Sequence, residues 1–342
     1  MKRDRSGFNL RERATRPSTL LAFALTALLI VALWRASGSF NLDQVRGAIA
    51  SARPVALAAA LTACIGTLLL RGLRWRRLIS SVGIHISRRA AVEILALSFW
   101  VNVILPAKIG DVYRAWLLKQ NGGASFGRAV GTVVVERAVD LVTVALLGVL
   151  SALVAFGGVL SPAVTALALV AFGLAVFGIA LLLFARGPAA RLVGRLPLPA
   201  VTADPIARAF DALKEGSGRG AILPILPYTL VIWGLQATRL GCVALALRLF
   251  QVDPAPGFLG ISAVLFTALV SAVLSTIPFT PAGIGIVEAG SVGILISIFA
   301  VPPESAIALT LLDRVIDIGS LMVGGGILFA VSPYPRGDGP LR

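Results

Sequence analysis

Long apolar runs separated by short polar segments dominate the chain. The apolar runs lie at 18–34, 54–72, 90–105, 129–156, 161–185, 221–248, 258–278, 286–300 and 305–331. A helix needs about 20 residues to cross the roughly 30 Å hydrocarbon core of a bilayer, and several runs reach that length. The pattern predicts an all-α, polytopic membrane protein with about 8 membrane-crossing or re-entrant units.

Lysine and arginine are unevenly distributed between the polar segments, which predicts how the helices are oriented. Basic segments are expected on the cytoplasmic side of a membrane. The basic segments are 1–17, 71–89 and 186–219, and the segments poor in Lys and Arg are 157–161, 251–257 and 301–304. The segment 35–53 carries three arginines, but a single membrane crossing separates it from the cytoplasmic N-terminus, so it should lie outside. We therefore expect both termini in the cytoplasm.

Two apolar runs must enter and leave the membrane on the same side, because the polar segments before and after each run are assigned to the same side. Residues 90–105 lie between basic segments, so this run must turn back, and Pro106 ends its helix because proline lacks an amide hydrogen. Residues 258–278 enter from the outside, and Pro278 and Pro281 break that helix. The sequence therefore predicts two re-entrant or broken helix pairs that enter from opposite sides.

The two proline breaks belong to an internal repeat. Both contain the pattern Pro-Ala-x-Ile-Gly, at 106–110 and again at 281–285. An acid-Arg-x-x-Asp motif follows each one, at 136–140 and at 313–317. Because the two copies should have opposite orientation, they predict the inverted-repeat plan of many secondary transporters.

The repeat and the charge pattern together divide the chain into segments. In the 186–219 linker, Ile206, Phe210 and Leu213 are spaced as in an amphipathic helix lying on the membrane surface. The expected segments are a basic cytoplasmic N-terminus at 1–17, a transmembrane domain at 18–331 with repeat 1 at about 54–185, linker 186–219 and repeat 2 at about 221–331, and a cytoplasmic tail at 332–342.

Charged side chains inside apolar segments are the candidate substrate-binding residues. Each one costs at least about 2.5–3.5 kcal/mol at the centre of a membrane helix, so it needs a partner or a function. The candidates are Lys108, Asp111, Arg114, Glu136, Arg137, Asp140, Glu288, Asp313, Arg314 and Asp317. The candidate helix breaks are Pro106, Gly110, Pro278, Pro281, Gly283 and Gly285.

Helical spacing leaves two interpretations of Arg137 and Arg314. Glu136 and Asp140 share one helix face, and so do Arg137 and Asp140, so each arginine could neutralise its neighbouring acids and hold the repeats together. Alternatively, the planar guanidinium groups could hold a lipid phosphate. Lys108, Asp111 and Glu288 lie at the helix breaks, where half-helix termini also suit a phosphate, although interfacial snorkelling is an alternative.

Other polar residues in or beside apolar runs have simpler explanations. Arg239 could have a partner elsewhere or bind a ligand. The arginines at 71, 74, 76 and 77, together with Trp75, are expected to anchor the protein on anionic lipid at the membrane interface. The three consecutive glycines 324–326 are expected to allow close helix packing.

Composition supports the membrane assignment and excludes several other functions. The chain is 57% hydrophobic and 14% charged, with a net charge of +15. Its basic residues flank apolar runs, so we expect no nucleic-acid partner. Cys64 and Cys242 both lie in apolar runs and are expected to be unpaired. Neither metal-ligand spacing nor a nucleotide-binding motif is found, so we expect no cofactor.

Three motifs in order resemble a known family. They are Asn102-x-x-x-Pro106-x-x-x-Gly110-Asp111-x-x-Arg114, Glu136-Arg137-x-x-Asp140, and Pro278-x-x-Pro281-x-Gly283-x-Gly285-x-x-Glu288. Over residues 18–331 the chain is similar to the lysylphosphatidylglycerol synthase transmembrane-region family, also called flippase-like membrane proteins. The resemblance implies a bacterial or archaeal cytoplasmic membrane and a role in lipid traffic. Because only residues 332–342 follow the last apolar run, the family's aminoacyl-transferase domain is not expected.

The sequence therefore favours a flippase or transporter of a lipid or lipid-linked anion, whose headgroup is carried in a polar cavity between the repeats. Membrane lipids bearing phosphate or another anionic group are the expected partners, with lipid-biosynthesis enzymes as further partners. Two alternatives are a membrane-embedded lipid-modifying enzyme and a non-catalytic partner of a lipid-synthesis complex. We expect no enzymatic activity, because no nucleophile with an adjacent base is found, although Asp and Glu beside a cavity could act as general bases.

Overall fold

The computed structural model describes residues 41–155, 162–184, 219–251, 259–276 and 280–341, together with Thr19, Leu20 and Ala24. Throughout these residues the secondary structure is helical, apart from one isolated bridge between Phe250 and Leu259. Several predicted features lie outside the described residues, namely most of the first apolar run, the amphipathic positions 206, 210 and 213, and Pro278.

Long helices form the frame of the protein. They are α4 (Pro54–Ser80), α7 (Phe126–Ala155), α8 (Pro162–Phe184) and α12 (Leu226–Ala246), with α11 (Arg219–Ile222) and η2 (Leu223–Ile225) leading into α12. Near the C-terminus, α15 (Pro303–Arg314) and α16 (Ser320–Val331) are joined by the π-helical turn η4 (Val315–Gly319). Within the described residues, four apolar helical segments are long enough to cross a membrane, at Pro54–Ser80, Phe126–Ala155, Gly220–Ala246 and Pro303–Val331.

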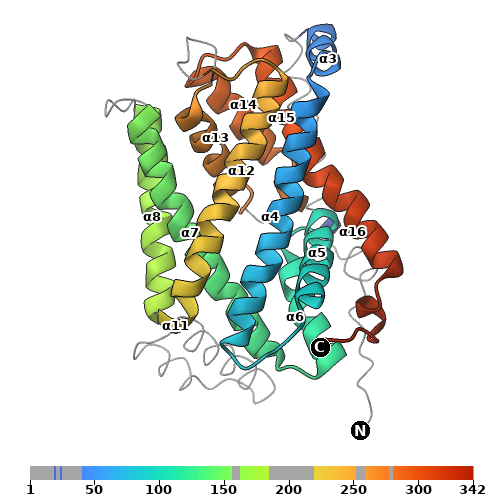
Figure 1. The fold of residues 1–342 in the computed structure, drawn as a ribbon. Coiled ribbons are helices and arrows are strands. Elements are labelled where there is room, and N and C mark those ends of the chain that lie inside the picture. The colour runs from blue at the N-terminus through green and yellow to red at the C-terminus, as the bar shows by residue number, and fades with distance from the viewer. Residues whose placement is uncertain are drawn as a thin grey trace.

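Two broken helix pairs lie at opposite ends of this frame (Figure 1). The first pair consists of α5 (Arg88–Ile104) and α6 (Ile109–Gly122), beside the end of α4 that carries Ser80. The second consists of α13 (Ile261–Leu274) and α14 (Ile286–Ser297), with the 3-10 turn η3 (Pro281–Gly283) between them, near the opposite end. The predicted polytopic fold with inverted repeats and two broken helix pairs is thereby confirmed.

At the first helix break, two hydrogen bonds made by the Gly110 backbone hold α6 against α5. Ala107 and Lys108 have left-handed φ angles of 61° and 52°, which turn the chain back after Pro106. The Gly110 amide donates to Oδ1 of Asn102 over 2.8 Å, and the Ser98 hydroxyl donates to the Gly110 carbonyl over 2.7 Å. A Cβ atom on Gly110 would lie 1.9 Å from the Ser98 carbonyl oxygen, so this close approach requires glycine.

In the second break, the Gly285 amide is equivalent to the Gly110 amide of the first, and a different side chain accepts its hydrogen bond. Gly285 has a φ of 90°, and its amide donates to Oε2 of Glu288 over 2.6 Å. Because hydrocarbon offers no hydrogen-bond partner, the amide that follows a helix break needs a partner within the protein. Asn102 provides it in repeat 1, and Glu288 provides it in repeat 2.

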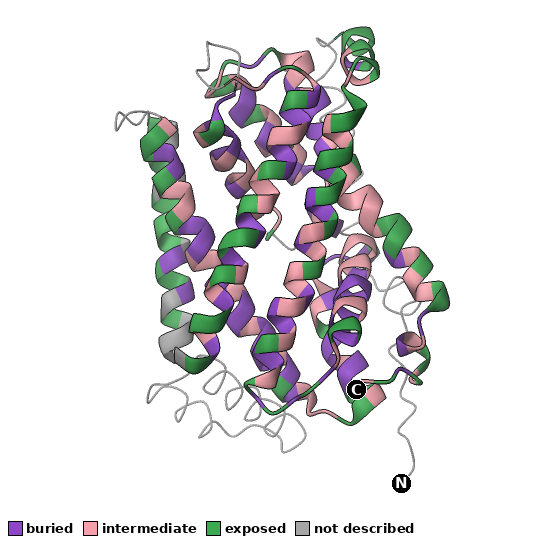
Figure 2. Cartoon of the chain, viewed as in Figure 1, coloured by how far each residue is buried: buried purple, intermediate pink, exposed green. Residues whose placement is uncertain are grey.

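Apolar packing joins the two halves, and α4 lies along α12. Figure 2 shows buried residues on the inward-facing sides of the helices, with exposed residues around the outside. The exposed outer residues of α7 include Leu146, Leu150 and Val154, as expected for side chains that face lipid. On the other side, the rings of Trp100 and Phe329 stack with centroids 4.7 Å apart and bring α16 against α5.

Two further segments lie at opposite ends of the molecule. Helix α3 (Leu42–Ala50) contacts α15, at the end opposite the 81–87 turn. The C-terminal segment begins with the 3-10 turn η5 (Tyr334–Arg336), and the Ser87 amide donates to the Leu341 carbonyl over 2.7 Å. The C-terminal segment thus lies at the same end as the arginine-rich 71–89 segment, and which end faces the cytoplasm stays a prediction.

Gly325 offers a test of the α5–α16 packing, because its neighbour Gly324 is a matched control. A Cβ on Gly325 would lie 2.5 Å from Cβ of Trp100, whereas Gly324 has no atom within 4 Å of that position. We expect Gly325→Ala to lower stability by about 1–3 kcal/mol through overpacking. Gly324→Ala should leave stability unchanged or raise it by up to about 1 kcal/mol, since alanine favours helix. Thermal unfolding in detergent compares the two variants, and equal melting temperatures would contradict the packing described here.

Candidate functional site

A cavity of about 580 Å³ lies between the two repeats. Residues of α4, α5, α6, α7, α8, α12, α13, α14, α15 and α16 line it, together with both helix breaks and the π-helical turn. The charged side chains on its wall are Arg71, Lys108, Asp111, Arg137, Asp140, Arg239, Asp313, Arg314 and Asp317. Pockets that bind small organic ligands commonly have volumes of about 300–1,000 Å³, and this cavity lies within that range.

The first cluster of ion pairs connects α4, α6 and α7. Arg74 donates to Oε1 of Glu136 over 2.8 Å and to both carboxylate oxygens of Asp140 over 2.6 and 2.9 Å. Arg114 donates to the other Glu136 oxygen over 3.0 Å. The side chains of Arg74, Arg114 and Glu136 are 0% exposed, so these charges depend entirely on one another.

Arg137 belongs to the same cluster but faces the cavity. It donates to both oxygens of Asp111, over distances of 2.9 to 3.1 Å, and 28% of its side chain is exposed. Two parallel hydrogen bonds fix the plane of the guanidinium group. Arg137 thereby joins α7 to the first turn of α6, directly after the helix break.

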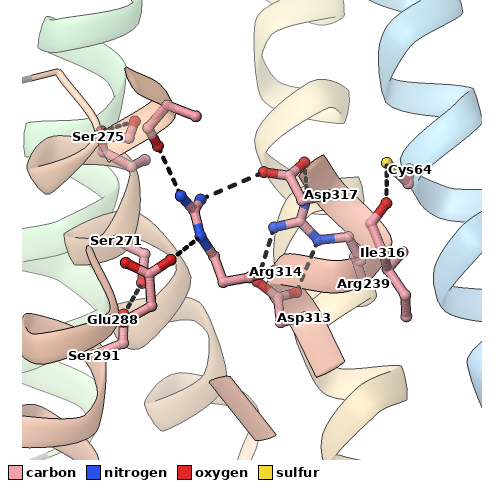
Figure 3. A network of polar contacts seen from close by, with 12 residues as sticks. Cys64, Arg239, Ser271, Ser275, Glu288, Ser291, Asp313, Arg314, Ile316 and Asp317 are labelled. Atoms are coloured by element: carbon pink, nitrogen blue, oxygen red, sulfur yellow. Dashed lines mark hydrogen bonds and ion pairs between the residues drawn. The ribbon is translucent and has the colours of Figure 1, made fainter. Parts of the chain in front are cut away.

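The second cluster repeats this arrangement in the other half of the chain (Figure 3). Arg239 on α12 donates to Asp313 over 2.8 and 3.0 Å and also contacts Asp317. Arg314 donates to Glu288 over 2.7 Å and to the Ala282 carbonyl at the second break over 2.7 Å. Asp317 lies in the π-helical turn, a conformation that occurs frequently at functional sites.

The ion pairs of the two clusters correspond, apart from those of Arg114, which has no counterpart among the described residues of the second cluster. Arg137 reaches 26 residues back to Asp111, and Arg314 reaches 26 residues back to Glu288. Each of these arginines therefore binds the acid that follows the helix break of its own repeat. An arginine on the first long helix of the repeat then neutralises the remaining acids, Arg74 in repeat 1 and Arg239 in repeat 2.

Two sequence-based interpretations need correction. Helical spacing paired Arg137 with Asp140, but Asp140 binds Arg74 while Arg137 binds Asp111, because partners on other helices give better geometry. The interfacial-anchor interpretation was wrong for Arg74, which is fully buried in the first cluster. Of its neighbours, Arg77 is exposed, as an interfacial residue should be.

Arg74 and Arg239 could have been recognised as equivalents only from their place in the repeats. Each lies on the helix that precedes a broken pair, and each serves the acid-Arg-x-x-Asp motif of its own repeat. Their separations from the first acid differ, at 62 residues from Arg74 to Glu136 and 74 from Arg239 to Asp313. Spacing alone therefore gave no signal, and the structure was needed to match them.

The structure also locates the other candidate residues. Lys108 lies at the first break in a left-handed conformation and lines the cavity, as does Gly283 of the second break. The amides of Gly110 and Gly285 form the hydrogen bonds that hold the two breaks. Cys64 and Cys242 are free thiols. Among the described residues, no group of His, Cys, Asp and Glu has the arrangement of a metal site.

Comparison with known proteins places this geometry in context. The model of the family described as "Lysylphosphatidylglycerol synthase TM region" matches residues 19–325. One relative, named "Glycosyltransferase AglD", from Haloferax volcanii, is 27% identical over 347 residues, which cover 92% of this chain. The chain spans only 55% of that relative's length. A second relative, "UPF0104 membrane protein MJ1078" of Methanocaldococcus jannaschii, is 27% identical over 232 residues, 68% of this chain and 94% of the relative.

The comparison corrects one expectation and supports another. The sequence was expected to specify no enzyme, and the relative named as a glycosyltransferase contradicts this. A missing nucleophile was a weak reason, because group transfer between bound substrates needs no covalent enzyme intermediate. The expected family is confirmed, since its model matches most of the chain, including both broken helix pairs and both ion-pair clusters. The chain is therefore a multi-pass membrane protein of the lysylphosphatidylglycerol synthase TM region family.

Proposed function

We propose that the chain holds the headgroup of an anionic lipid in the cavity between its repeats, while the lipid tails remain in the bilayer. The observation that carries this proposal is the cavity itself, which is large enough for a headgroup and is lined with charged side chains from both inverted repeats. Charges are costly inside a membrane, so a charged cavity of this size is a candidate site by default. We place the protein in the cytoplasmic membrane, with lipid-biosynthesis enzymes as its further partners.

The inverted repeats support translocation of the bound headgroup. In transporters built from such repeats, one half rocks against the other and exposes a central site to each side in turn. The two clusters suit this motion, because Arg137 and Arg314 each connect a long helix to a broken pair within one repeat. Each repeat could therefore move as a unit without separating an ion pair.

The comparisons favour a second candidate, modification of the same headgroup. The relative named as a glycosyltransferase aligns over 92% of this chain, so the membrane region described here is shared with a protein named for group transfer. In this role the cavity would hold the lipid acceptor or donor, and Asp111 or Asp317 beside it could accept a proton. A non-catalytic subunit that presents lipid to a partner enzyme would use the same cavity.

One reconstitution experiment tests the two candidates together. The full chain is incorporated into liposomes with fluorescent lipids of several headgroups, including polyprenyl phosphates, and transbilayer movement is measured by quenching at the outer leaflet. Parallel vesicles receive radiolabelled lipid with sugar donors, and products are separated by chromatography. We expect movement or turnover of at least one phosphate-bearing lipid above protein-free vesicles. If neither process exceeds that background for any lipid class, the proposed function is wrong.

A stability measurement tests whether the first ion-pair cluster holds the fold. Arg74→Gln leaves Glu136 and Asp140 buried without their main partner, so we expect a loss of about 3–5 kcal/mol and a much lower melting temperature. Arg77→Gln is the matched control on the same helix, and because Arg77 is exposed the change should stay within about 0.5 kcal/mol. Similar melting temperatures for the two variants would show that the first cluster does not hold the fold.

Arg314 should behave differently, because its side chain reaches the cavity and contacts the second break. We expect Arg314→Ala and Glu288→Gln to reduce lipid movement or turnover about tenfold or more, while a protein that still unfolds cooperatively is recovered. The reconstitution assay and thermal unfolding are run on the same preparations. Full activity in both variants would assign the second cluster to structure alone.

A further inference from the structure

Two cations that face the cavity have no ion partner among the described residues. Arg71 makes no hydrogen bond or salt bridge there, and its Nε atom is buried without a partner. Lys108 likewise has no salt bridge or side-chain hydrogen bond within the described part of the chain. The other cavity-lining arginines are all ion-paired. An unpaired charge in a low-dielectric site is costly, which indicates that a ligand supplies the missing partner.

Arg71 is held in position by aromatic rings rather than by acids. Its guanidinium carbon lies 5.6 Å from the ring centre of Phe99 on α5 and 5.5 Å from that of Trp233 on α12. Aromatic faces attract a cation while leaving its N–H groups available to an anion. Since α5 belongs to repeat 1 and α12 to repeat 2, Arg71 lies where the two repeats meet.

Lys108 reaches the same cavity from the first helix break. Its backbone φ of 52° places it in the left-handed turn between α5 and α6, and the two residues that follow begin α6. Arg71 and Lys108 repel each other electrostatically, with Asp111, Asp140 and Arg137 as the other charged groups that act on Lys108. An anion bound between Arg71 and Lys108 would relieve this repulsion.

The described charged groups around the cavity have an excess of one positive charge. The first cluster is balanced, because Arg74, Arg114 and Arg137 face Asp111, Glu136 and Asp140. The second cluster has one surplus carboxylate, because Arg239 and Arg314 face Glu288, Asp313 and Asp317. The two unpaired cations more than offset it, so the described charged groups of the site lack one negative charge.

We propose that Arg71 and Lys108 form a subsite for one phosphodiester group of a lipid headgroup. This inference rests on the proposed function and narrows its substrate class. A phosphodiester carries one negative charge and matches the excess, whereas a terminal phosphate monoester carries about −1.5 to −2 at pH 7 and a pyrophosphate carries more. Two kinds of lipid contain this group, namely glycerophospholipids such as phosphatidylglycerol and sugar-phosphate-polyprenols.

Binding measurements on the full chain in phosphatidylcholine nanodiscs test the subsite. Fluorescent phosphatidylglycerol and a glycosyl phosphopolyprenol represent the two diester sources, and phosphatidic acid, polyprenyl phosphate and polyprenyl pyrophosphate represent more highly charged groups. We expect one of the diesters to bind most tightly. Arg71→Gln and Lys108→Gln should each weaken its binding about tenfold or more, with Arg77→Gln as the matched control that leaves the affinity unchanged.

A charge-shift variant tests the electrostatic basis of the selectivity. Asp317→Asn removes the surplus carboxylate of the second cluster and raises the excess to two positive charges. The preference should then move from the diester toward polyprenyl phosphate or phosphatidic acid by about tenfold. Thermal unfolding confirms that each variant is folded, and Asp317→Glu, which keeps the charge, should retain the diester preference.

The outcomes separate this inference from the proposed function. If wild-type protein binds a monoester or a pyrophosphate most tightly, or if Arg71→Gln and Lys108→Gln bind the diester as well as Arg77→Gln does, the subsite is wrong while headgroup binding stands. If no lipid of any class binds above protein-free nanodiscs, the proposed function itself fails.

Discussion

Ion pairing between helices in a low-dielectric environment is the constraint on which this structure depends. Arg74, Arg114 and Glu136 have no exposed side-chain surface, so each charge is stable only while the others stay in place. The Arg74 guanidinium group also donates to Thr229 on α12 over 3.0 Å, which connects the first cluster to the second half of the chain. The positions of α4, α6, α7 and α12 are therefore coupled through a few side-chain atoms.

The helix breaks create a second requirement, which the two repeats meet differently. A broken helix inside a membrane exposes backbone amides, and the protein must provide their partners. Repeat 1 uses the neutral side chain of Asn102, so Asp111 takes no part in holding the break and pairs with Arg137 and, over 3.7 Å, with Arg114. Repeat 2 uses Glu288 for both purposes, because one oxygen accepts from the Gly285 amide and the other accepts from Arg314. The second break is thus directly coupled to its ion-pair cluster, and the first is coupled less directly.

The two repeats also contribute different charges to the cavity. Among the described residues, repeat 1 contributes two cations without an ion partner, Arg71 and Lys108, whereas repeat 2 contributes a surplus carboxylate. Perfectly symmetric repeats would give a cavity with no preference for one end of a headgroup over the other. The family model matches residues 19–325, which include every residue that lines this cavity.

The sequence by itself determined the membrane class, the helical content, the proline breaks and the inverted repeat. These features follow from local properties, namely the length of apolar runs, the missing amide of Pro106 and Pro281, and the alternation of basic segments. It also identified the acids and arginines of the two repeated motifs, because charge is rare within apolar runs.

Tertiary structure decided which charges are paired. Asp140 lies three residues after Arg137 but binds Arg74, which is 66 residues away, because carboxylate and guanidinium groups bind where their geometry and burial are best rather than where the chain is shortest. For the same reason, only the folded chain distinguished Arg71, which is held between aromatic rings beside the cavity, from Arg74, which is buried among acids one turn further along the same helix.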